Sequence, residues 1–227
     1  MCGRFTVATP VEELAREFGF EPPAEPLPLR FNVAPTQPVP ALTSDDPGHL
    51  SLLRWGLVPS WADDLAIGNR LINARAETLA EKPAFRKAFA ERRCLVLADG
   101  FFEWRKEGKR RFPIWLRRAD HRPFAFAGLW EVWRTPEGGW LRTCTIVTVP
   151  ANSLVAPIHD RMPAILPPEH RAAWLAAPPA EARALLVPFP AGEMEALPVS
   201  PRINSPAVDD PACVEPFVRP LSLPFDR

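Results

Sequence analysis

The stretch from Cys94 to Val149 constrains the fold most, because it carries the clearest β pattern in the chain. Two apolar runs flank residues 106–109, where Gly108 is able to take the positive φ of a tight hairpin turn. Two further apolar runs flank residues 135–139 and predict a second hairpin. The middle of the chain is therefore expected to be β-sheet.

Thirty prolines among 227 residues limit what surrounds this sheet. Because proline lacks an amide hydrogen and interrupts helices, we expect short elements joined by rigid turns. The clearest helix signal is Thr9-Pro10, with Thr9 as the cap, Pro10 at the first helical position and Glu12 returning a capping-box bond. Gly19 is expected to end this helix.

Further short elements are expected on both sides of the hairpins. Residues 35–40, with three prolines, are expected in a loop or at a sheet edge. The other expected elements are strands at 39–43 and 50–58, a segment at 71–75 entering a helix near 76–91, helices from Pro168 (with Trp174) and from Pro178 to Leu186, and a strand near 197–199. The predicted fold class is α+β, a single domain over residues 1–227 with a strongly curved antiparallel, barrel-like sheet and peripheral helices.

The charge pattern leaves nucleic acid open as a partner without demanding it. Lys and Arg together number 27, as do Asp and Glu, but residues 86–118 hold eleven cations against four acids. Such a stretch is more often a solvated face than a binding site.

Cys94 and Cys144 lie in apolar runs and are expected to be buried, and the four cysteines lack zinc spacing. Because the sequence shows no signal peptide and no long apolar run, we expect a cytoplasmic protein. We expect no metal or cofactor.

Cys2 is a candidate nucleophile. Once Met1 is removed, Cys2 carries a thiol and a free α-amine, which titrate near pH 8.5 and pH 8 respectively. Two nucleophiles so placed can close on one aldehyde as a five-membered thiazolidine ring. The alternative is a disordered terminus whose cysteine has no role.

Polar side chains in apolar surroundings mark further candidates. Asn73, Arg75 and Glu77 recur with period two, which places them on one face of an extended segment. Glu103 lies between aromatic residues. Burial there would raise the pKa of its carboxyl, and a carboxyl with a raised pKa suits proton transfer. An equal alternative is that Glu103 forms a salt bridge with an arginine. His159 lies in a proline-bounded loop and is able to exchange protons near neutral pH, or is simply exposed.

Trp61 follows Pro59 in an expected loop and fits no amphipathic pattern. It either packs in the core or offers a platform on which an unpaired base stacks.

Taken together, six segments resemble the SOS-response-associated peptidase (SRAP) family. They are MCGRF at 1–5, FNVAP at 31–35, WGLVPSW at 55–61, NARAET at 73–78, ADGFFEW at 98–104 and IHDRMP at 158–163. Val199-Ser200 and Asn204 continue the match, which is thinnest beyond about residue 205.

This resemblance implies a sensor of abasic sites that crosslinks to the ring-opened sugar in single-stranded DNA, protecting the site during replication and the DNA damage response. It also implies self-removal of Met1, a monomer, and single-stranded DNA or a single-strand/duplex junction as partner, near the nucleoid and not at a membrane. Cys2 would be the nucleophile, Glu103 would transfer protons, His159 would help open the sugar, and Asn73 would hold the terminus. The DNA-binding residues it implies are Arg4, Asn32, Pro35, Trp61, Arg75, Trp104, Thr148 and Arg161.

Two other functions use the same features. Class II glutamine amidotransferases and related N-terminal nucleophile hydrolases also begin Met-Cys-Gly, but no glutamine-pocket pattern follows residue 5. A non-catalytic single-strand binder would keep the fold and leave no adduct after denaturation.

Overall fold

The fold is that of a computed structural model, which describes residues 2–218. Its strands are β1 Phe5–Val7, β2 Arg30–Val33, β3 Pro38–Thr43, β4 Asp46–Trp55, β5 Asn73–Arg75, β6 Arg93–Ala98, β7 Gly100–Glu107, β8 Arg110–Arg118, β9 Phe124–Arg134, β10 Trp140–Pro150, β11 Arg161–Pro163, β12 Ile165–Leu166 and β13 Met194–Pro198. The α-helices are α1 Val11–Phe18, α2 Arg86–Glu91, α3 Pro168–Ala176 and α4 Pro179–Ala184, and single 3₁₀ turns lie at Leu65–Arg70, Ala76–Thr78, Ala191–Glu193, Pro201–Asn204 and Pro211–Cys213.

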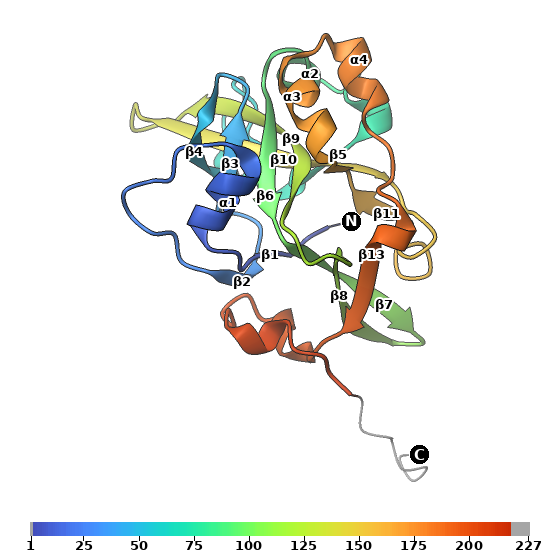
Figure 1. The fold of residues 1–227 in the computed structure, drawn as a ribbon. Helices are drawn as coiled ribbons and strands as arrows, with labels where there is room; N and C mark the ends of the chain where they lie inside the picture. Colours follow the sequence, from blue (N-terminus) through green and yellow to red (C-terminus); the bar gives the residue numbers. More distant parts are fainter. Residues whose placement is uncertain (1, 219–227) are drawn as a thin grey trace.

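Five strands close into a barrel in the order β10-β4-β3-β6-β9, with β9 pairing back to β10. Four of the five pairings are antiparallel, whereas β10 and β4 run parallel through Thr143↔Arg54 and Cys144↔Trp55. Short strands β5, β11 and β12 extend this sheet, and the helices lie around it (Figure 1). The predicted α+β class with a barrel-like core is therefore confirmed, with a parallel seam that the prediction did not include.

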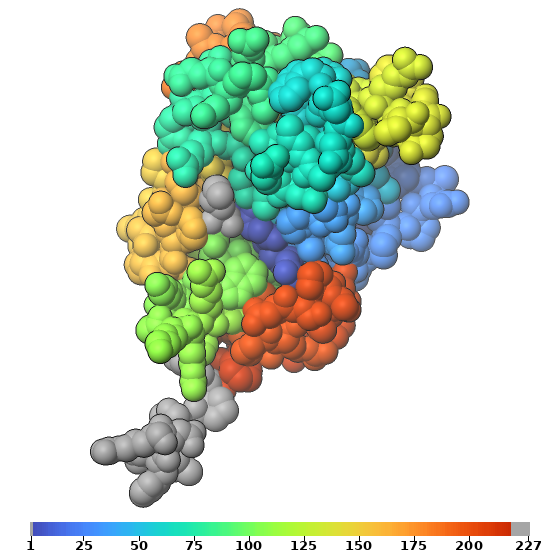
Figure 2. Space-filling model, turned by 180° about the vertical axis from the view of Figure 1, so that it is seen from behind, coloured from blue at the N-terminus to red at the C-terminus, as the bar shows by residue number. Residues whose placement is uncertain are grey.

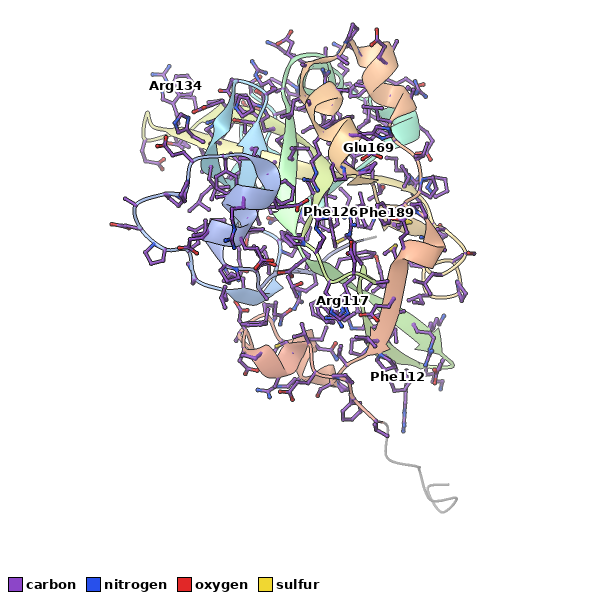
Figure 3. All side chains as sticks on the ribbon, viewed as in Figure 1. Phe112, Arg117, Phe126, Arg134, Glu169 and Phe189 are labelled. Atoms are coloured by element: carbon purple, nitrogen blue, oxygen red, sulfur yellow. The ribbon has the colours of Figure 1, made fainter. Side chains whose placement is uncertain are left out.

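A second sheet, in the order β13-β8-β7-β1-β2, carries the start of the chain. The Phe5 ring in β1 lies 5.1 Å from the ring of Trp55 and 5.7 Å from that of Phe126, measured between centroids. Phe126 lies near the middle of the molecule in Figure 3. Burying a phenylalanine contributes about 2–3 kcal/mol, so Phe5 fixes the first strand against the barrel three residues from Cys2.

Two glycines permit close approaches that any side chain would block. A Cβ on Gly100 would lie 2.1 Å from Trp115 Nε1, at the point where β7 pairs with β1. Gly56 has a φ of 120°, and a Cβ there would lie 2.7 Å from the carbonyl oxygen of Gly68. The left-handed Gly56 ends β4 at Trp55, so the predicted strand at 50–58 instead spans Asp46–Trp55.

Most of the local predictions are confirmed. Both central hairpins form, with positive φ at Gly108 and Gly138, and Cys94 and Cys144 are buried. The prolines of residues 35–40 precede Ala41–Thr43, the part of β3 that pairs with β6. The helices after Pro168 and Pro178 also form, and the last strand spans Met194–Pro198.

Two helix predictions are wrong. The N-cap of α1 is Pro10, whose side chain makes no capping hydrogen bond. The Thr9 hydroxyl does not cap the helix, because it donates to Asp99 Oδ2 at 2.8 Å. The helix expected near 76–91 is broken into the turn Ala76–Thr78 and the short helix α2, because Pro83 lacks the amide hydrogen that a continuous helix needs. Within residues 2–218, no helix has the length and apolar character to cross a membrane.

Candidate functional site

Cys2 lies fully buried just before β1. Its thiol donates to the carbonyl oxygen of Arg4 at 3.6 Å. Burial raises the pKa of the Cys2 thiol, and the negative charge of Glu103 adds to that effect. The thiol is therefore protonated at neutral pH, and its use as a nucleophile requires a group that accepts its proton. Figure 2 shows the blue atoms of the chain's start at the floor of a hollow.

Asn73 fixes this residue from the barrel side. It begins β5, which pairs with β10 through Ile146, and its Nδ2 donates to the carbonyl oxygen of Cys2 at 2.7 Å. The Asn73 Oδ1 atom is buried and accepts no hydrogen bond from any residue among 2–218. An acceptor is thus left open beside the candidate nucleophile, where a donor such as a hydroxyl could satisfy it.

Glu103 and His159 complete the cluster. Glu103 lies in β7 and is 3% exposed, and burial raises the pKa of its carboxyl while the nearby His159 lowers it. Since the charge of Glu103 also acts on the Cys2 thiol, the three residues form one electrostatic group. The structure therefore brings together all four residues expected to be catalytic.

The His159 ring is oriented by its own loop. The backbone N–H of Arg161 lies 3.0 Å from His159 Nδ1 and donates to it. The exposed Asp160 carboxylate lies 2.9 Å from the same Nδ1, where it accepts a hydrogen bond from the ring when that nitrogen is protonated. Both contacts are made by the neighbouring residues of the loop and fix the orientation of the ring.

Arg4, whose carbonyl oxygen accepts from the Cys2 thiol, pairs with Trp104. The Arg4 guanidinium lies 5.9 Å from the Trp104 ring centroid and donates to Asn32 Oδ1 and to the Ile203 carbonyl, both at 2.8 Å. Trp104 Nε1 donates in turn to Asn204 Oδ1 at 2.8 Å. The segment around residues 203–204 thus fixes both side chains, and the buried Arg4 Nε–H donates to no acceptor within the described residues.

Asn32 and Thr148, both expected at DNA, are fully buried. Asn32 Nδ2 donates to three carbonyl oxygens between Ile203 and Val208, at 3.2, 3.0 and 2.6 Å. Thr148 Oγ1 donates to the Ala74 carbonyl at 3.4 Å. Their polar groups are engaged within the chain, so these two residues position their neighbours and do not present a free surface.

Arg161 is also engaged, because its guanidinium forms two bonds with the Glu77 carboxylate, at 2.6 and 2.9 Å. It donates further to the Thr148 carbonyl at 2.6 Å, and it lowers the pKa of Glu77. A phosphate would have to share Arg161 with Glu77. Glu77 appeared in the sequence only as part of a period-two pattern.

The remaining candidates lie further out. Trp61 is 59% exposed, and it lines an open cavity of about 540 Å³ together with Ala66, Ile67 and Arg70. The core-packing alternative for Trp61 is therefore excluded. Arg75 is exposed, whereas Pro35 is partly buried at the end of β2.

A family model described as SOS response associated peptidase (SRAP) matches residues 1–206. The chain belongs to the SOS response associated peptidase family. The match covers the whole cluster around Cys2 as well as Arg4, Trp61 and Arg161.

Relatives within and beyond bacteria are named as abasic site processing proteins. YoqW of Bacillus subtilis is 44% identical over 223 residues, covering 95% of this chain and 99% of that protein. YedK of Escherichia coli is 37% identical over 183 residues, covering 77% and 79%. HMCES of Gallus gallus is 35% identical over 192 residues, which span 73% of this chain and 56% of that protein.

Solved structures share the fold. A protein from Bacteroides thetaiotaomicron matches with a TM-score of 0.86 at 29% identity, covering 96% of this chain and all of that one. A protein from Bordetella bronchiseptica matches with a TM-score of 0.77 at 27% identity, covering 88% of this chain.

Asp99 is a residue of this family member whose role the sequence did not reveal. It accepts hydrogen bonds from the hydroxyls of Thr6 and Thr9 and from the Ala8 amide, and thereby ties the end of β1 to the β6–β7 corner. Burial raises the pKa of its carboxyl, while these hydrogen bonds lower it.

We expect Asp99→Ala to reduce the free energy of unfolding by about 2–4 kcal/mol, because it leaves three donors unpaired. Urea unfolding followed by tryptophan fluorescence measures this loss. The matched control is Asp63→Ala, an exposed acid without a hydrogen bond to residues 2–218, which should change stability by less than about 0.5 kcal/mol. Equal effects of the two substitutions would remove Asp99 from this role.

Proposed function

We propose that this chain processes abasic sites in single-stranded DNA by forming a covalent thiazolidine through Cys2. The observation that carries the proposal is the position of Cys2, held by Asn73 and electrostatically coupled to Glu103 and, through it, to His159. The names of the relatives, from YoqW to HMCES, support abasic sites as the substrate.

The chemistry begins once Met1 is removed and the α-amine of Cys2 is free. An abasic sugar in its ring-opened form presents an aldehyde at C1′. The amine attacks this carbon to give a carbinolamine, which loses one water to form an imine. The Cys2 sulfur then attacks the imine carbon and the thiol proton passes to the nitrogen. The product is a thiazolidine, and one water is released in total.

Each neighbour has a proton to hold or move in this sequence. Glu103 accepts a proton from the attacking amine and returns it to the departing hydroxyl, which its raised pKa favours. His159 protonates the sugar ring oxygen during opening. Asn73 holds the Cys2 carbonyl and offers its open Oδ1 to a sugar hydroxyl.

The same site offers the elements of single-strand binding. Trp104 and the exposed Trp61 are available for base stacking, which contributes about 1–3 kcal/mol per base. The exposed Arg75 is available for phosphates, the half-buried Arg4 would contribute its positive charge, and Arg161 would share its charge with Glu77. Pro35 would border the bound DNA, while Asn32 and Thr148 hydrogen-bond Arg4 and Arg161 and so position them.

The proposal includes removal of Met1 by the chain itself, action as a monomer and a place with the nucleoid in the cytoplasm. Met1 removal is the precondition for the chemistry, because an amide nitrogen cannot form an imine.

The test is a denaturing gel of the protein mixed with a single-stranded oligonucleotide that carries one abasic site. We expect a shifted band that survives denaturation. The control oligonucleotide carries a tetrahydrofuran analogue, which has the same backbone but cannot open to an aldehyde, and should give no band. The proposal is rejected if both oligonucleotides shift on a native gel but neither shifts on a denaturing gel. That result would identify a non-covalent binder.

A further inference from the structure

The β7–β8 hairpin carries a group of cations that the proposed chemistry does not use. Lys106, Lys109, Arg110 and Arg111 are all exposed around the turn at Gly108. None of their four side chains has a hydrogen bond or ion pair to another residue of the described part of the chain. The nearest acid along the hairpin, Glu107, lies 2.8 Å from the Arg105 guanidinium. Glu107 lies across from Arg110 and is the one acid among residues 106–111, so the tip carries an excess of positive charge.

The register of the hairpin aligns two of these cations with Trp104. Lys106 lies directly across from Arg111, and Trp104 lies across from Pro113. Because side chains two residues apart share a face of a strand, Trp104, Lys106 and Arg111 project from the same face. A strand advances about 6.6 Å over two residues, so the cations begin one such step outward from the tryptophan.

The hairpin also lies beside the active-site hollow. In Figure 2 its light green atoms border the hollow that shows the start of the chain. Phe112, next to Arg111, marks the outer end of the hairpin in Figure 3, whereas Arg134 lies at the opposite corner of the molecule. A strand that stacks on Trp104 and leaves the site on this side would pass the cations.

We propose that Lys106 and Arg111 bind the phosphodiester backbone of the DNA that flanks the abasic nucleotide, with Lys109 extending this surface at the tip. This inference rests on the proposed function, because the DNA is placed by Cys2 and Trp104. Single-stranded and base-paired flanks present the same phosphates, so the chemistry is common to both.

The test is the double substitution Lys106→Gln/Arg111→Gln, with dissociation constants measured by fluorescence anisotropy. The ligand is a single-stranded oligonucleotide with a central tetrahydrofuran site, so crosslinking does not interfere. Neutralising two phosphate contacts should weaken binding about tenfold at about 50 mM salt, and the gap should nearly close at about 200 mM, because the salt slope falls by about 0.7 per contact. The control is Arg134→Gln/Arg16→Gln, two exposed cations away from the site, which should leave affinity within about twofold.

Flank trimming adds a second readout. The native-to-variant affinity ratio should fall toward one when the flank on the hairpin side is shortened, and should persist when the other flank is shortened. Repeating the measurement with that flank base-paired shows which form of DNA the hairpin prefers. Two results would overturn the inference once thermal unfolding shows that the variant is folded. One is a native-to-variant affinity ratio near one with both single-stranded and base-paired flanks. The other is a ratio that falls equally when either flank is shortened. Failure of the proposed function looks different, because the native protein would then form no adduct with an abasic site.

Discussion

Cys2→Ala is expected to abolish the adduct with an abasic oligonucleotide. Its affinity for the tetrahydrofuran oligonucleotide should change by less than about threefold, because the substitution removes no strong contact to DNA. In variant protein whose mass shows that Met1 is absent, the α-amine is kept and only the sulfur is lost, so an imine could form and hydrolyse but no ring could close. The measurement is a denaturing gel run in parallel with anisotropy.

The matched control is Cys144→Ala, a buried thiol in the barrel strand β10. It should lose stability but retain crosslinking of the folded fraction. The thiazolidine mechanism is wrong if, in the absence of borohydride, Cys2→Ala forms as much crosslink as the native protein.

Glu103→Gln is expected to slow crosslinking by about 100-fold or more, which is the usual contribution of a positioned acid–base group. Glutamine keeps the size and the hydrogen-bonding capacity but cannot take up a proton. Binding to the tetrahydrofuran oligonucleotide should stay within about threefold, because the carboxyl is buried and distinct from the phosphate-binding groups. Loss of binding instead would make Glu103 a structural residue.

The pH dependence follows from the raised pKa of Glu103. As a base it must be ionised, so the native rate should rise with pH through a value above the ordinary 4.5 of a glutamate. A second rise near pH 8 reflects deprotonation of the α-amine. In Glu103→Gln the first rise should vanish and the second should remain, whereas an exposed acid such as Glu12, changed to Gln, should keep both.

The sequence predicted those parts of the fold that depend on short-range patterns. The two hairpins need only alternating apolar residues and a glycine with positive φ, and both formed as predicted. The burial of Glu103 followed from its aromatic neighbours. The parallel pairing of β10 with β4 joins residues about ninety apart, and no local periodicity encodes such a contact.

The site shows the same division. Cys2, Asn73, Glu103 and His159 stood out as reactive types in unusual settings, and the fold brings them together. Long-range partners could not be found in this way: Glu77 reaches Arg161 across 84 positions, and Asp209 accepts from the amides of Phe31 and Asn32 across 178 and 177. Such partners are ordinary surface acids in the sequence, and only the tertiary structure distinguishes them.

The predicted capping box failed for a related reason. Thr9 and Glu12 have the right spacing for a cap, but the buried Asp99 offers the Thr9 hydroxyl a stronger, charged acceptor. A tertiary contact therefore replaced a local one, and that contact holds the strand that follows Cys2.

The intact mass of the adduct distinguishes a thiazolidine at Cys2 from an imine or a non-covalent complex. Protein whose mass shows that Met1 is absent is mixed with an abasic oligonucleotide, denatured and analysed without borohydride. We expect a species whose mass equals protein plus oligonucleotide minus one water, and we expect it to be absent with the tetrahydrofuran analogue and with Cys2→Ala. An adduct that survives only after borohydride reduction, or none at all, would contradict a thiazolidine at Cys2.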